Sequence, residues 1–245
     1  MKITLITVCF NSEETISRTI QSVINQKYSQ IEYIIIDGGS TDSTLSIIEK
    51  YKKFISIIKS ENDDGIYDAI NKGIILATGD LVGLLHSDDY YPNNQVITNV
   101  ATSFKNDISL DIVVGDVAFI DGKENIARYY SGEKFNFNIG MMPPHPSVFL
   151  KRKCYERFGS FNTNYKIAAD YDLLFRFIKI NKLKYSYSKN IIVNMSLGGK
   201  SNQNIFSIIR LNLEIYKIHQ SHNYSISVID LFKKIPIRLR ELLYQ

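Results

Sequence analysis

Leu84-Leu85-His86-Ser87-Asp88-Asp89 joins an apolar segment directly to two adjacent carboxylates. The apolar run begins at Leu81, and short runs of this kind are typical of buried parallel strands. Ligands of open α/β sheets bind just beyond the carboxyl ends of such strands. Neighbouring carboxylates repel each other unless a cation or strong hydrogen-bond donors neutralise them. The stretch therefore predicts a divalent-metal site where an α/β sheet holds a nucleotide, with helix capping near Pro92 as the alternative.

Strand and helix patterns alternate on the amino-terminal side of this stretch. Strands are expected at 3–9, 31–37, 55–59 and 81–85, and helices at 11–26, 41–51, 66–77 and 92–104. This alternation predicts an α/β fold with a parallel, doubly wound sheet. The second half is less regular. Paired strands are expected at 111–119 and 125–130, an ordered loop at 141–146, a helix at 168–181, a strand at 191–195, and helices at 204–219 and 227–243.

The composition is that of an ordinary globular protein of 245 residues, enough for one large α/β domain or a domain with a small appendage. Cys9 and Cys154 form no metal-spaced pair, no apolar run approaches the length of a transmembrane helix, and the N-terminus does not resemble a signal peptide. A reduced, cytoplasmic protein is therefore expected. Residues 200–245 hold seven basic and three acidic residues, which accounts for the whole net charge of +4. The excess charge belongs to the tail, and no nucleic-acid partner is predicted.

Polar side chains follow each of the first three predicted strands. These segments are 7–11, 37–42 and 60–65, and the carboxyl ends of parallel strands lie at one edge of a sheet. Carboxylates at this edge suit the donors of a nucleobase imide or of ribose hydroxyls. For Asp42, helix capping is the favoured interpretation. For Asp37, which follows three isoleucines, ligand contact is favoured.

Four ordered motifs resemble those of the family-2 glycosyltransferases. They are Thr7-Val8-Cys9-Phe10-Asn11, Asp37-Gly38-Gly39-Ser40-Thr41-Asp42, Asp64-Gly65-Ile66-Tyr67-Asp68-Ala69-Ile70-Asn71-Lys72-Gly73 and His86-Ser87-Asp88-Asp89. The resemblance covers roughly residues 1–201. It implies the GT-A fold, with a Rossmann-like, mostly parallel sheet, helices on both faces and additional C-terminal helices. We expect a glycosyltransferase domain over 1–201, with a nucleotide-sugar half at about 1–105 and an acceptor half at about 106–201, and a helical extension over 202–245.

The resemblance also implies the donor site. In the family, the acidic motif after the fourth strand holds Mn²⁺ or Mg²⁺ on the diphosphate of a nucleotide-sugar. Asp88 and Asp89 match that motif, whereas His86 stands where the family usually has an aspartate. For Lys72, a packing role is as plausible as a ligand role. The nucleotide-binding residues expected are Thr7, Asn11, Asp37, Asp64, Asn71, Lys72, Ser87 and Asp88.

A second motif, Ala168-Ala169-Asp170-Tyr171-Asp172-Leu173, resembles the family segment whose aspartate is the general base of inverting enzymes. That aspartate corresponds to Asp170, and Ala169 replaces the usual glutamate. A carboxylate is chemically suited to this role, because an acceptor hydroxyl must lose its proton as it attacks the anomeric carbon. The alternative is that Asp170 caps its helix. His145 and Lys200 are further candidates for diphosphate or acceptor contacts, and plain structural roles are the alternatives.

The predicted function is an inverting, metal-dependent transfer of sugar from a nucleotide-sugar, most plausibly a UDP-sugar, to a lipid-linked saccharide of bacterial surface polysaccharide such as O-antigen or capsule. Basic and apolar residues at 233–243 favour contact with the inner face of the cytoplasmic membrane, with an ordinary helix or a homo-oligomer contact as the alternative. A sugar-nucleotidyltransferase is less consistent with Asn11-Ser12-Glu13-Glu14, where a basic, glycine-rich loop is expected. A non-catalytic nucleotide-sugar-binding module stays open because of His86 and Ala169.

Overall fold

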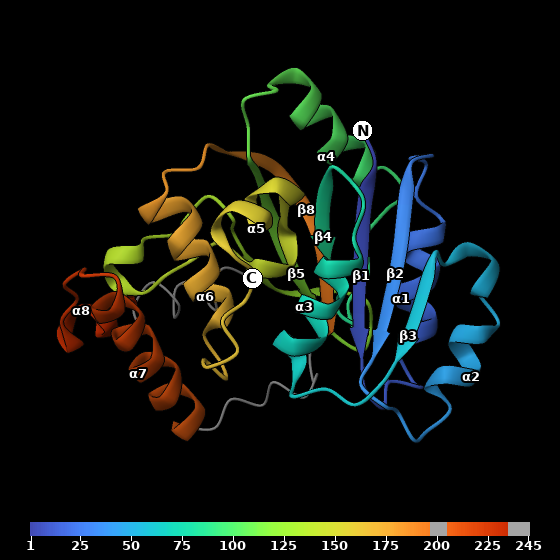
Figure 1. Ribbon diagram of the computed structural model, residues 1–245, viewed down its shortest axis with the longest axis horizontal. Helices are drawn as coiled ribbons and strands as arrows, with labels where there is room; N and C mark the ends of the chain where they lie inside the picture. The colour runs from blue at the N-terminus through green and yellow to red at the C-terminus, as the bar shows by residue number, and fades with distance from the viewer. Residues whose placement is uncertain (197–204, 235–245) are drawn as a thin grey trace.

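The computed structural model describes residues 1–196 and 205–234. In these residues one mixed sheet carries helices on both faces, as the sequence predicted (Figure 1). The strands are β1 (Ile3–Cys9), β2 (Ile31–Asp37), β3 (Ile57–Ser60), β4 (Leu81–Leu84), β5 (Ile112–Ile120), β6 (Ile126–Tyr130), β7 (Val148–Lys151) and β8 (Tyr185–Ser196). The α-helices are α1 (Ile16–Ile24), α2 (Thr44–Glu49), α3 (Ile66–Leu76), α4 (Val96–Asn106), α5 (Arg152–Phe158), α6 (Ala169–Leu174), α7 (Ile205–Ser221) and α8 (Val228–Phe232).

The amino-terminal half of the sheet is parallel, in the order β3-β2-β1-β4. Cys9 at the end of β1 pairs with Asp37 at the end of β2, and Asp37 pairs with Ser60 at the end of β3. The polar segments that follow these strands therefore start at one edge of the sheet, which confirms the arrangement expected from the sequence.

The second half of the sheet is mixed. Strand β7 pairs antiparallel with both β4 and β5, whereas β8 runs parallel to β5. The sequence pattern missed β7 and α5 altogether, and β8 begins at Tyr185 rather than near residue 191. The helix expected over 168–181 is α6 continued by a π-helical segment, Phe175–Ile180.

Two hydrophobic cores cover the two faces of the sheet, because successive side chains of a strand point to opposite faces. Ile6 and Val8 of β1 pack with Ala69 and Ile70 of α3. Ile3 and Leu5 of the same strand pack on the other face, where α1, α2 and α4 contribute Ile16, Ile20, Ile48, Val96 and Val100. The apolar runs are thus explained by burial on both faces.

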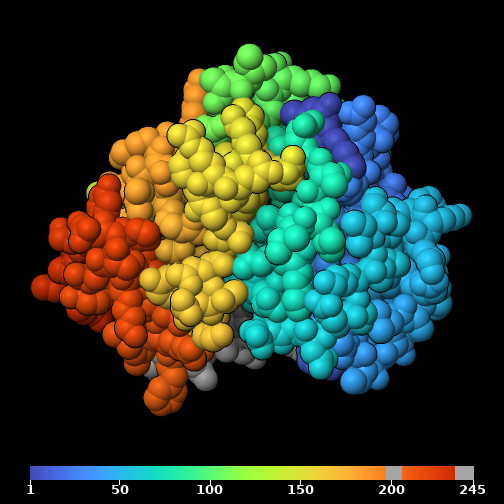
Figure 2. All heavy atoms as spheres, viewed as in Figure 1, coloured from blue at the N-terminus to red at the C-terminus, as the bar shows by residue number. Residues whose placement is uncertain are grey.

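The C-terminal helices pack on the same core as α3. Ile215 and Ile218 of α7 and Leu231 of α8 join the cluster that contains Leu173 and Phe175. Figure 2 shows α7 and α8, in orange and red, lying directly against the yellow and light-orange segments that precede them in the chain. Among the described helices, none has both the length and the apolarity to cross a membrane. Residues 235–243 of the basic tail lie outside the described part of the chain.

Candidate active site

Hydrogen bonds between loops tie the strand ends into a single rim. The backbone N–H of Asn11 donates to Ser40 Oγ at 2.8 Å, and Asn11 Oδ1 accepts from the N–H of Thr41 at 2.9 Å. The hydroxyls of Ser12 and Ser87 lie 2.9 Å apart, which joins the loop after β1 to the loop after β4. Asn11 adopts a left-handed backbone conformation with φ of 47°. Asn11 and Ser87 are therefore brought to the predicted edge, where their side chains organise the loops.

Asp37 is fully buried, and its carboxylate holds the loop that follows β2. Its Oδ2 accepts from the N–H groups of Gly39 and Ser40, at 3.1 and 3.0 Å, and from Ser60 Oγ at 2.7 Å. The loop after β3 lies so close that a Cβ on Gly38 would come 2.4 Å from Asp63 Oδ2, and the Asp63 side chain would have to move. The Asp37 carboxylate thus makes its hydrogen bonds within the protein, and its contact with a nucleobase stays a prediction.

Asp42 has the structural role that the sequence favoured. Its Oδ1 accepts from the N–H of Thr44, the first residue of α2, at 3.0 Å. Its Oδ2 accepts from the N–H of Glu13 at 3.2 Å. The carboxylate therefore stabilises the start of α2 and ties it to the loop after β1.

Asp64 is the carboxylate of the β3–α3 loop that is exposed at this edge and makes no side-chain hydrogen bond or ion pair with the described residues. Lys72 has instead a bracing role, because its Nζ donates to the carbonyl of Asn62 and forms ion pairs with Glu61 and Asp68 at 3.0–3.1 Å. Asp64 is thus better placed than Lys72 to contact a bound nucleotide-sugar.

Two residues predicted to bind the nucleotide, Thr7 and Asn71, use their polar groups for contacts within the protein. Thr7 has no exposed surface, and its hydroxyl lies 3.1 Å from the Tyr33 hydroxyl inside the core. Asn71 pairs with the backbone of Phe161, donating to its carbonyl at 2.9 Å and accepting from its N–H at 3.0 Å. The structure therefore gives Thr7 and Asn71 packing and loop-fixing contacts, and it does not bring their side-chain polar groups to the rim.

The two carboxylates of the opening motif have contrasting surroundings. Asp88 is half-buried, and its side chain makes no hydrogen bond or ion pair with the described residues. Asp89 is fully buried, and neither of its carboxylate oxygens has a hydrogen-bond partner in the described part of the chain. Burial, reinforced by the charge of Asp88, raises the pKa of Asp89 well above its usual range, although Arg18 opposes the shift. The motif therefore holds one accessible and one enclosed carboxylate.

In the described part of the chain, no three or more His, Cys, Asp or Glu side chains lie close enough together to hold a metal ion by themselves. Mg²⁺ in nucleotide sites does not need such a group, because it binds one or two carboxylates and completes its coordination shell with phosphate oxygens and water. Asp88 offers an accessible carboxylate of this kind, and Asp89 a partnerless one. The donor set fits a cation shared between protein and diphosphate, and Asp88 fits it better because Asp89 has no exposed surface.

His145 lies beside the motif, as one of its predicted roles requires. Its ring centroid is 6.5 Å from that of His86 and 5.3 Å from that of Phe161. Burial and the neighbouring His86 lower the pKa of His145 to about 3. Burial likewise lowers the pKa of His86, although Asp88 opposes the shift. Both imidazoles are therefore neutral near pH 7.

Asp170 stands in the first turn of α6, facing α3. Its Oδ1 accepts from the N–H of Tyr171 at 2.8 Å and from the Tyr67 hydroxyl at 3.4 Å. Burial raises the pKa of Asp170 to about 6, although these hydrogen bonds lower it. A base with a pKa just below neutrality is largely ionised at pH 7 and still binds a proton well. Asp170 thus makes no N-terminal capping bond for α6, and its basicity is raised.

A continuous line of contacts joins Asp170 to the acidic motif. Tyr67 contacts Asp170 and stacks on Phe161 at 5.6 Å, and Phe161 meets His145, which meets His86. These contacts connect two motifs that lie more than 80 residues apart in the sequence, through the buried rings of Phe161 and His145. Asp64 lies in the loop just before α3, the helix that carries Tyr67.

Three residues that the sequence did not single out help to build the region around Asp170 and the acidic motif. Arg18 of α1 donates to the carbonyl of Asp88 at 3.3 Å and to Ser196 Oγ at 2.6 Å. Tyr67 donates to the carbonyl of Ile167 at 2.8 Å, and Glu214 of α7 accepts from backbone N–H groups before α6. Tyr67 lies within a quoted motif, whereas no local pattern marks Arg18 or Glu214. Lys200 lies outside the described residues.

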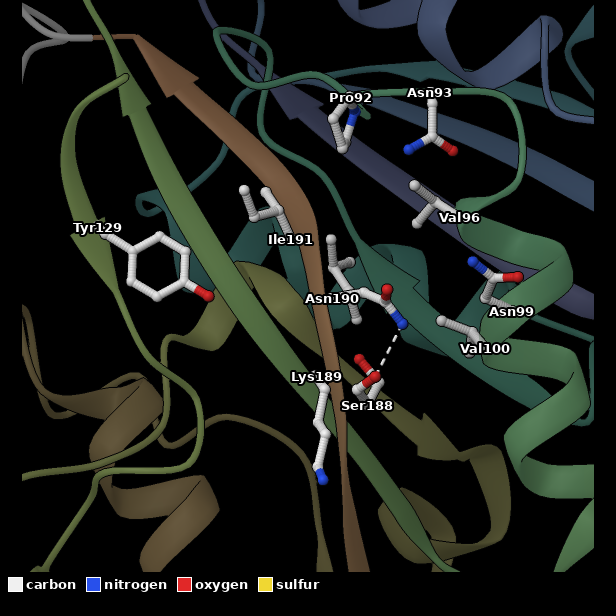
Figure 3. Close-up of a pocket in the computed structure, with 11 residues that line it drawn as sticks. Pro92, Asn93, Val96, Asn99, Val100, Tyr129, Ser188, Lys189, Asn190 and Ile191 are labelled. Atoms are coloured by element: carbon white, nitrogen blue, oxygen red, sulfur yellow. Dashed lines mark hydrogen bonds between the residues drawn. The ribbon is translucent and has the colours of Figure 1, made fainter.

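A pocket of about 430 Å³ lies between α4 and β8 (Figure 3). Amide side chains of Asn93, Asn99 and Asn190 line it together with Tyr129 and Lys189. It contains none of the predicted site residues and no carboxylate. The described residues that line this pocket therefore offer no carboxylate as a general base.

Comparisons with known proteins agree with this geometry. The sequence model of glycosyl transferase family 2 matches residues 4–182. An uncharacterized glycosyltransferase of Mycobacterium tuberculosis is 30% identical over 189 residues, which cover 71% of this chain and 68% of that protein. An Escherichia coli protein named UDP-Glc:alpha-D-GlcNAc-diphosphoundecaprenol beta-1,3-glucosyltransferase is 27% identical over 137 residues, covering 56% of this chain and 53% of that protein.

Solved structures share the fold at low sequence identity. TarS of S. aureus in complex with UDP-GlcNAc superposes with a TM-score of 0.70 at 18% identity, covering 95% of this chain and 71% of that chain. The mannosyltransferase PcManGT of Pyrobaculum calidifontis, in complex with GDP-Man and Mn²⁺, gives 0.68 at 18% identity, covering 98% and 69%. With the family match over most of its length, the chain belongs to glycosyl transferase family 2 and is a glycosyltransferase of GT-A fold.

Proposed function

We propose that this glycosyltransferase is an inverting, metal-dependent enzyme that transfers a sugar from a nucleotide-sugar, a UDP-sugar, to a saccharide acceptor. The observation that carries the proposal is the joining of Asp170 to the Asp88 motif through Tyr67, Phe161 and His145. A base and a diphosphate site are the two parts that such a transfer requires.

Asp170 is the general base of the proposed reaction. Its carboxylate removes the proton of an acceptor hydroxyl while the hydroxyl oxygen attacks the anomeric carbon of the donor. The bond between that carbon and the diphosphate oxygen breaks on the opposite side, so the configuration inverts. The pKa of about 6 suits this step, because Asp170 is ionised before the reaction and receives the proton during it.

Asp88 would hold Mn²⁺ or Mg²⁺ together with the donor diphosphate. A bound divalent cation supplies charge stabilisation for the departing diphosphate. The accessible carboxylate of Asp88, which has no side-chain partner among the described residues, supports this assignment. His86 and His145, both neutral, place no positive charge beside the cation.

Asp64 and Asp37 would contact the nucleoside. Asp64 is exposed at the rim and able to accept from ribose hydroxyls or an imide N–H. The E. coli relative is named for UDP-glucose and TarS was solved with UDP-GlcNAc, which favours uracil, whereas PcManGT was solved with GDP-Man. A UDP-sugar is therefore our first choice of donor and a GDP-sugar the comparison to test against it.

The acceptor would be a lipid-linked saccharide of a surface polysaccharide, presented at an anionic membrane. The E. coli relative is named for a diphosphoundecaprenol-linked acceptor. Helices α7 and α8 carry exposed apolar side chains, with Phe206 81% and Ile229 73% exposed, and basic residues accompany them at Lys217 and Lys233. Apolar residues with adjacent lysines suit an anionic lipid surface. The full apolar set is Phe206, Ile208, Ile209, Leu213, Tyr216, Val228, Ile229 and Phe232.

A donor-hydrolysis screen tests the proposed reaction. Release of nucleoside diphosphate from UDP-, GDP- and TDP-sugars is measured with and without Mn²⁺ for the wild type and for Asp170→Asn, and a saccharide-lipid extract serves as acceptor in parallel. We expect Mn²⁺-dependent turnover of a UDP-sugar that Asp170→Asn reduces by roughly 10²- to 10⁴-fold. Metal-dependent UDP binding without turnover, with or without acceptor, would instead favour a binding module. Full turnover by Asp170→Asn would exclude this residue as the base.

Co-sedimentation with vesicles tests the membrane contact. Phe206→Ser combined with Ile209→Ser is expected to weaken binding to phosphatidylglycerol vesicles. Ile108→Ser is the matched control, because Ile108 is 84% exposed and lies outside the C-terminal helices. Equal binding by both variants and the wild type would refute the contact.

A further inference from the structure

Helix α6 begins without a capping side chain of its own. Its N-cap position is Ala168, which has no side-chain acceptor for the N–H groups at the start of the helix. Asp170, the proposed base, comes two residues later. The geometry of Asp170 therefore depends on what fixes the backbone of residues 166–168.

A carboxylate from the C-terminal extension holds the backbone just before the helix. Glu214 of α7 is buried, and its Oε2 accepts from the N–H groups of Ile167 and Ala168 at 2.9 and 3.0 Å. Its Oε1 accepts from the N–H of Lys166 at 3.2 Å and from Arg210 Nε, also at 3.2 Å. One side chain thus receives three consecutive backbone donors from a segment more than 45 residues away in the sequence.

The same segment is held from the opposite direction by α3. The Tyr67 hydroxyl donates to the carbonyl of Ile167 at 2.8 Å and contacts Asp170 Oδ1 at 3.4 Å. The peptide group before α6 is therefore fixed through both its N–H and its C=O. Tyr67 and Glu214 lie in the donor half and in the C-terminal extension, respectively, so Asp170 is placed by contacts from both.

We propose that Glu214 is a positioning residue for the general base, and that Glu214 and Tyr67 together clamp the backbone from which Asp170 projects. This inference deepens the proposed function and rests on Asp170 as the base. It makes helix α7, which lies beyond the residues matched by the family model, a working part of the active site. Misplacement of a reacting group by an ångström is enough to lower the rate of an enzyme about 100-fold.

The charge of Glu214 also affects Asp170. Although burial opposes it, the backbone N–H groups of Ile167, Ala168 and Lys166 lower the pKa of Glu214, so Glu214 is ionised near neutrality. The titratable groups that face Asp170 are Tyr67 of α3 and Glu214 of α7, and Arg210 faces Glu214 in turn. The negative charge of Glu214 adds to the burial that raises the pKa of Asp170. Neutralising Glu214 should therefore lower the pKa of Asp170.

Glu214→Gln tests the clamp, because glutamine keeps the size of the side chain and loses both the charge and one acceptor oxygen. The primary readout is the ¹³Cγ resonance of Asp170 in aspartate-labelled full-length protein, assigned by its absence in Asp170→Asn. In the wild type we expect a titration midpoint near pH 6, and in Glu214→Gln a lower midpoint. Amide hydrogen exchange of Ile167 and Ala168 should become faster in Glu214→Gln.

Kinetics give the second readout. For the donor sugar with the highest turnover, we expect Glu214→Gln to lower kcat by roughly 10- to 100-fold while KM for the donor stays unchanged. Asp230→Asn is the matched control. Asp230 is also a capping carboxylate of the C-terminal extension, but it belongs to the capping box of α8 and does not contact α6. It should leave kcat and the Asp170 midpoint at their wild-type values.

The outcomes separate the clamp from the proposed function. If Asp170→Asn keeps full turnover, Asp170 is not the base, whatever Glu214→Gln does. If Asp170→Asn is inactive but Glu214→Gln keeps the wild-type kcat, Asp170 midpoint and amide protection, the clamp alone is overturned. A lower melting temperature of Glu214→Gln with unchanged kcat and midpoint would also overturn it, because Glu214 would then serve stability only.

Discussion

Two buried carboxylates at opposite edges of the parallel sheet, Glu32 and Asp89, differ in their hydrogen-bond partners. At the amino-terminal edge, Glu32 accepts from Lys2 Nζ and Thr4 Oγ1, both at 2.6 Å, and from the Thr78 N–H and hydroxyl at 2.8 and 2.6 Å. At the carboxyl edge, Asp89 is even more deeply buried and has no partner among the described residues.

The difference appears in proton affinity. Burial acts to raise the pKa of Glu32, but its four hydrogen bonds outweigh burial and lower the pKa to about 2. Among the described residues no hydrogen-bond donor offsets the burial of Asp89, whose pKa is well above its usual range. The hydrogen bonds to Asp170 offset its burial only in part, and its pKa is raised to about 6. Carboxylates with full sets of donors stabilise a fold, whereas perturbed ones at a strand edge mark a functional site. The following predictions test this division.

The largest effect is expected from Asp88→Asn. Loss of the accessible carboxylate removes a protein ligand of the cation, and charge stabilisation by a metal contributes several kcal/mol. We expect Mn²⁺-dependent donor turnover to fall roughly 10³-fold, with little change in melting temperature. Manganese titration followed by electron paramagnetic resonance would show weaker binding in the presence of nucleotide. Glu133→Gln, an exposed acid away from the rim, is the control. Wild-type turnover by Asp88→Asn would mean that the accessible carboxylate has no metal role.

Glu32→Gln should strongly affect stability and leave catalysis intact. Its hydrogen bonds include charged groups, so we expect the free energy of unfolding at pH 7 to fall by about 2–3 kcal/mol. Because the folded-state pKa is lowered to about 2, this stabilisation is complete above the unfolded-state pKa of about 4.3 and is lost as the pH falls toward 2. Urea unfolding across this pH range would show a shallower acid dependence in Glu32→Gln. An identical acid dependence in both proteins would contradict the assignment.

Asp89→Asn is expected to stabilise the protein, in contrast to Glu32→Gln. Replacing a buried, partnerless acid by a neutral amide is expected to raise the unfolding free energy of the metal-free protein at pH 7 by about 1–3 kcal/mol. Thermal unfolding in the presence of a chelator measures this change. Asp64→Asn is the comparison, because an exposed carboxylate should change stability by no more than about 0.5 kcal/mol. Destabilisation by Asp89→Asn would show that Asp89 has a stabilising partner.

The smallest effect is expected from Lys72→Met. Lys72 pairs with Glu61 and Asp68 on a partly exposed surface, so its removal should lower stability only slightly, and less at high salt. If Lys72 only braces the β3–α3 loop, nucleotide affinity measured by calorimetry should be unchanged. A marked loss of nucleotide affinity with unchanged stability would instead assign Lys72 to the donor site.

Local sequence patterns predicted the parallel half of the fold well. Apolar runs buried on both faces and intervening amphipathic helices define β1 to β4 and α1 to α3, and the carboxyl edge follows from parallel pairing. The same reasoning placed Asp170 at the start of a helix and Asp88 at a strand end.

The remaining features depend on partners distant in the sequence. Strand β7 is recognisable as a strand only through its antiparallel pairing with β4 and β5. Asn71 is held by Phe161, and Glu214 holds the segment before α6, each across tens of residues. The periodicity of a single sequence does not reveal such contacts. For this reason the sequence suggests nucleotide binding for Asn71 and no role for Glu214.

The central claim is that Asp170 acts as a base whose pKa is raised by burial, and the pH dependence of kcat/KM tests it most directly. Donor turnover is measured from pH 4.5 to 9 for the wild type and for the residual activity of Asp170→Asn. Since the base must be unprotonated, we predict that wild-type kcat/KM rises with pH through an apparent pKa of about 6, and that this limb is absent from Asp170→Asn. A flat wild-type profile across pH 6, or the same limb in both proteins, would contradict the account.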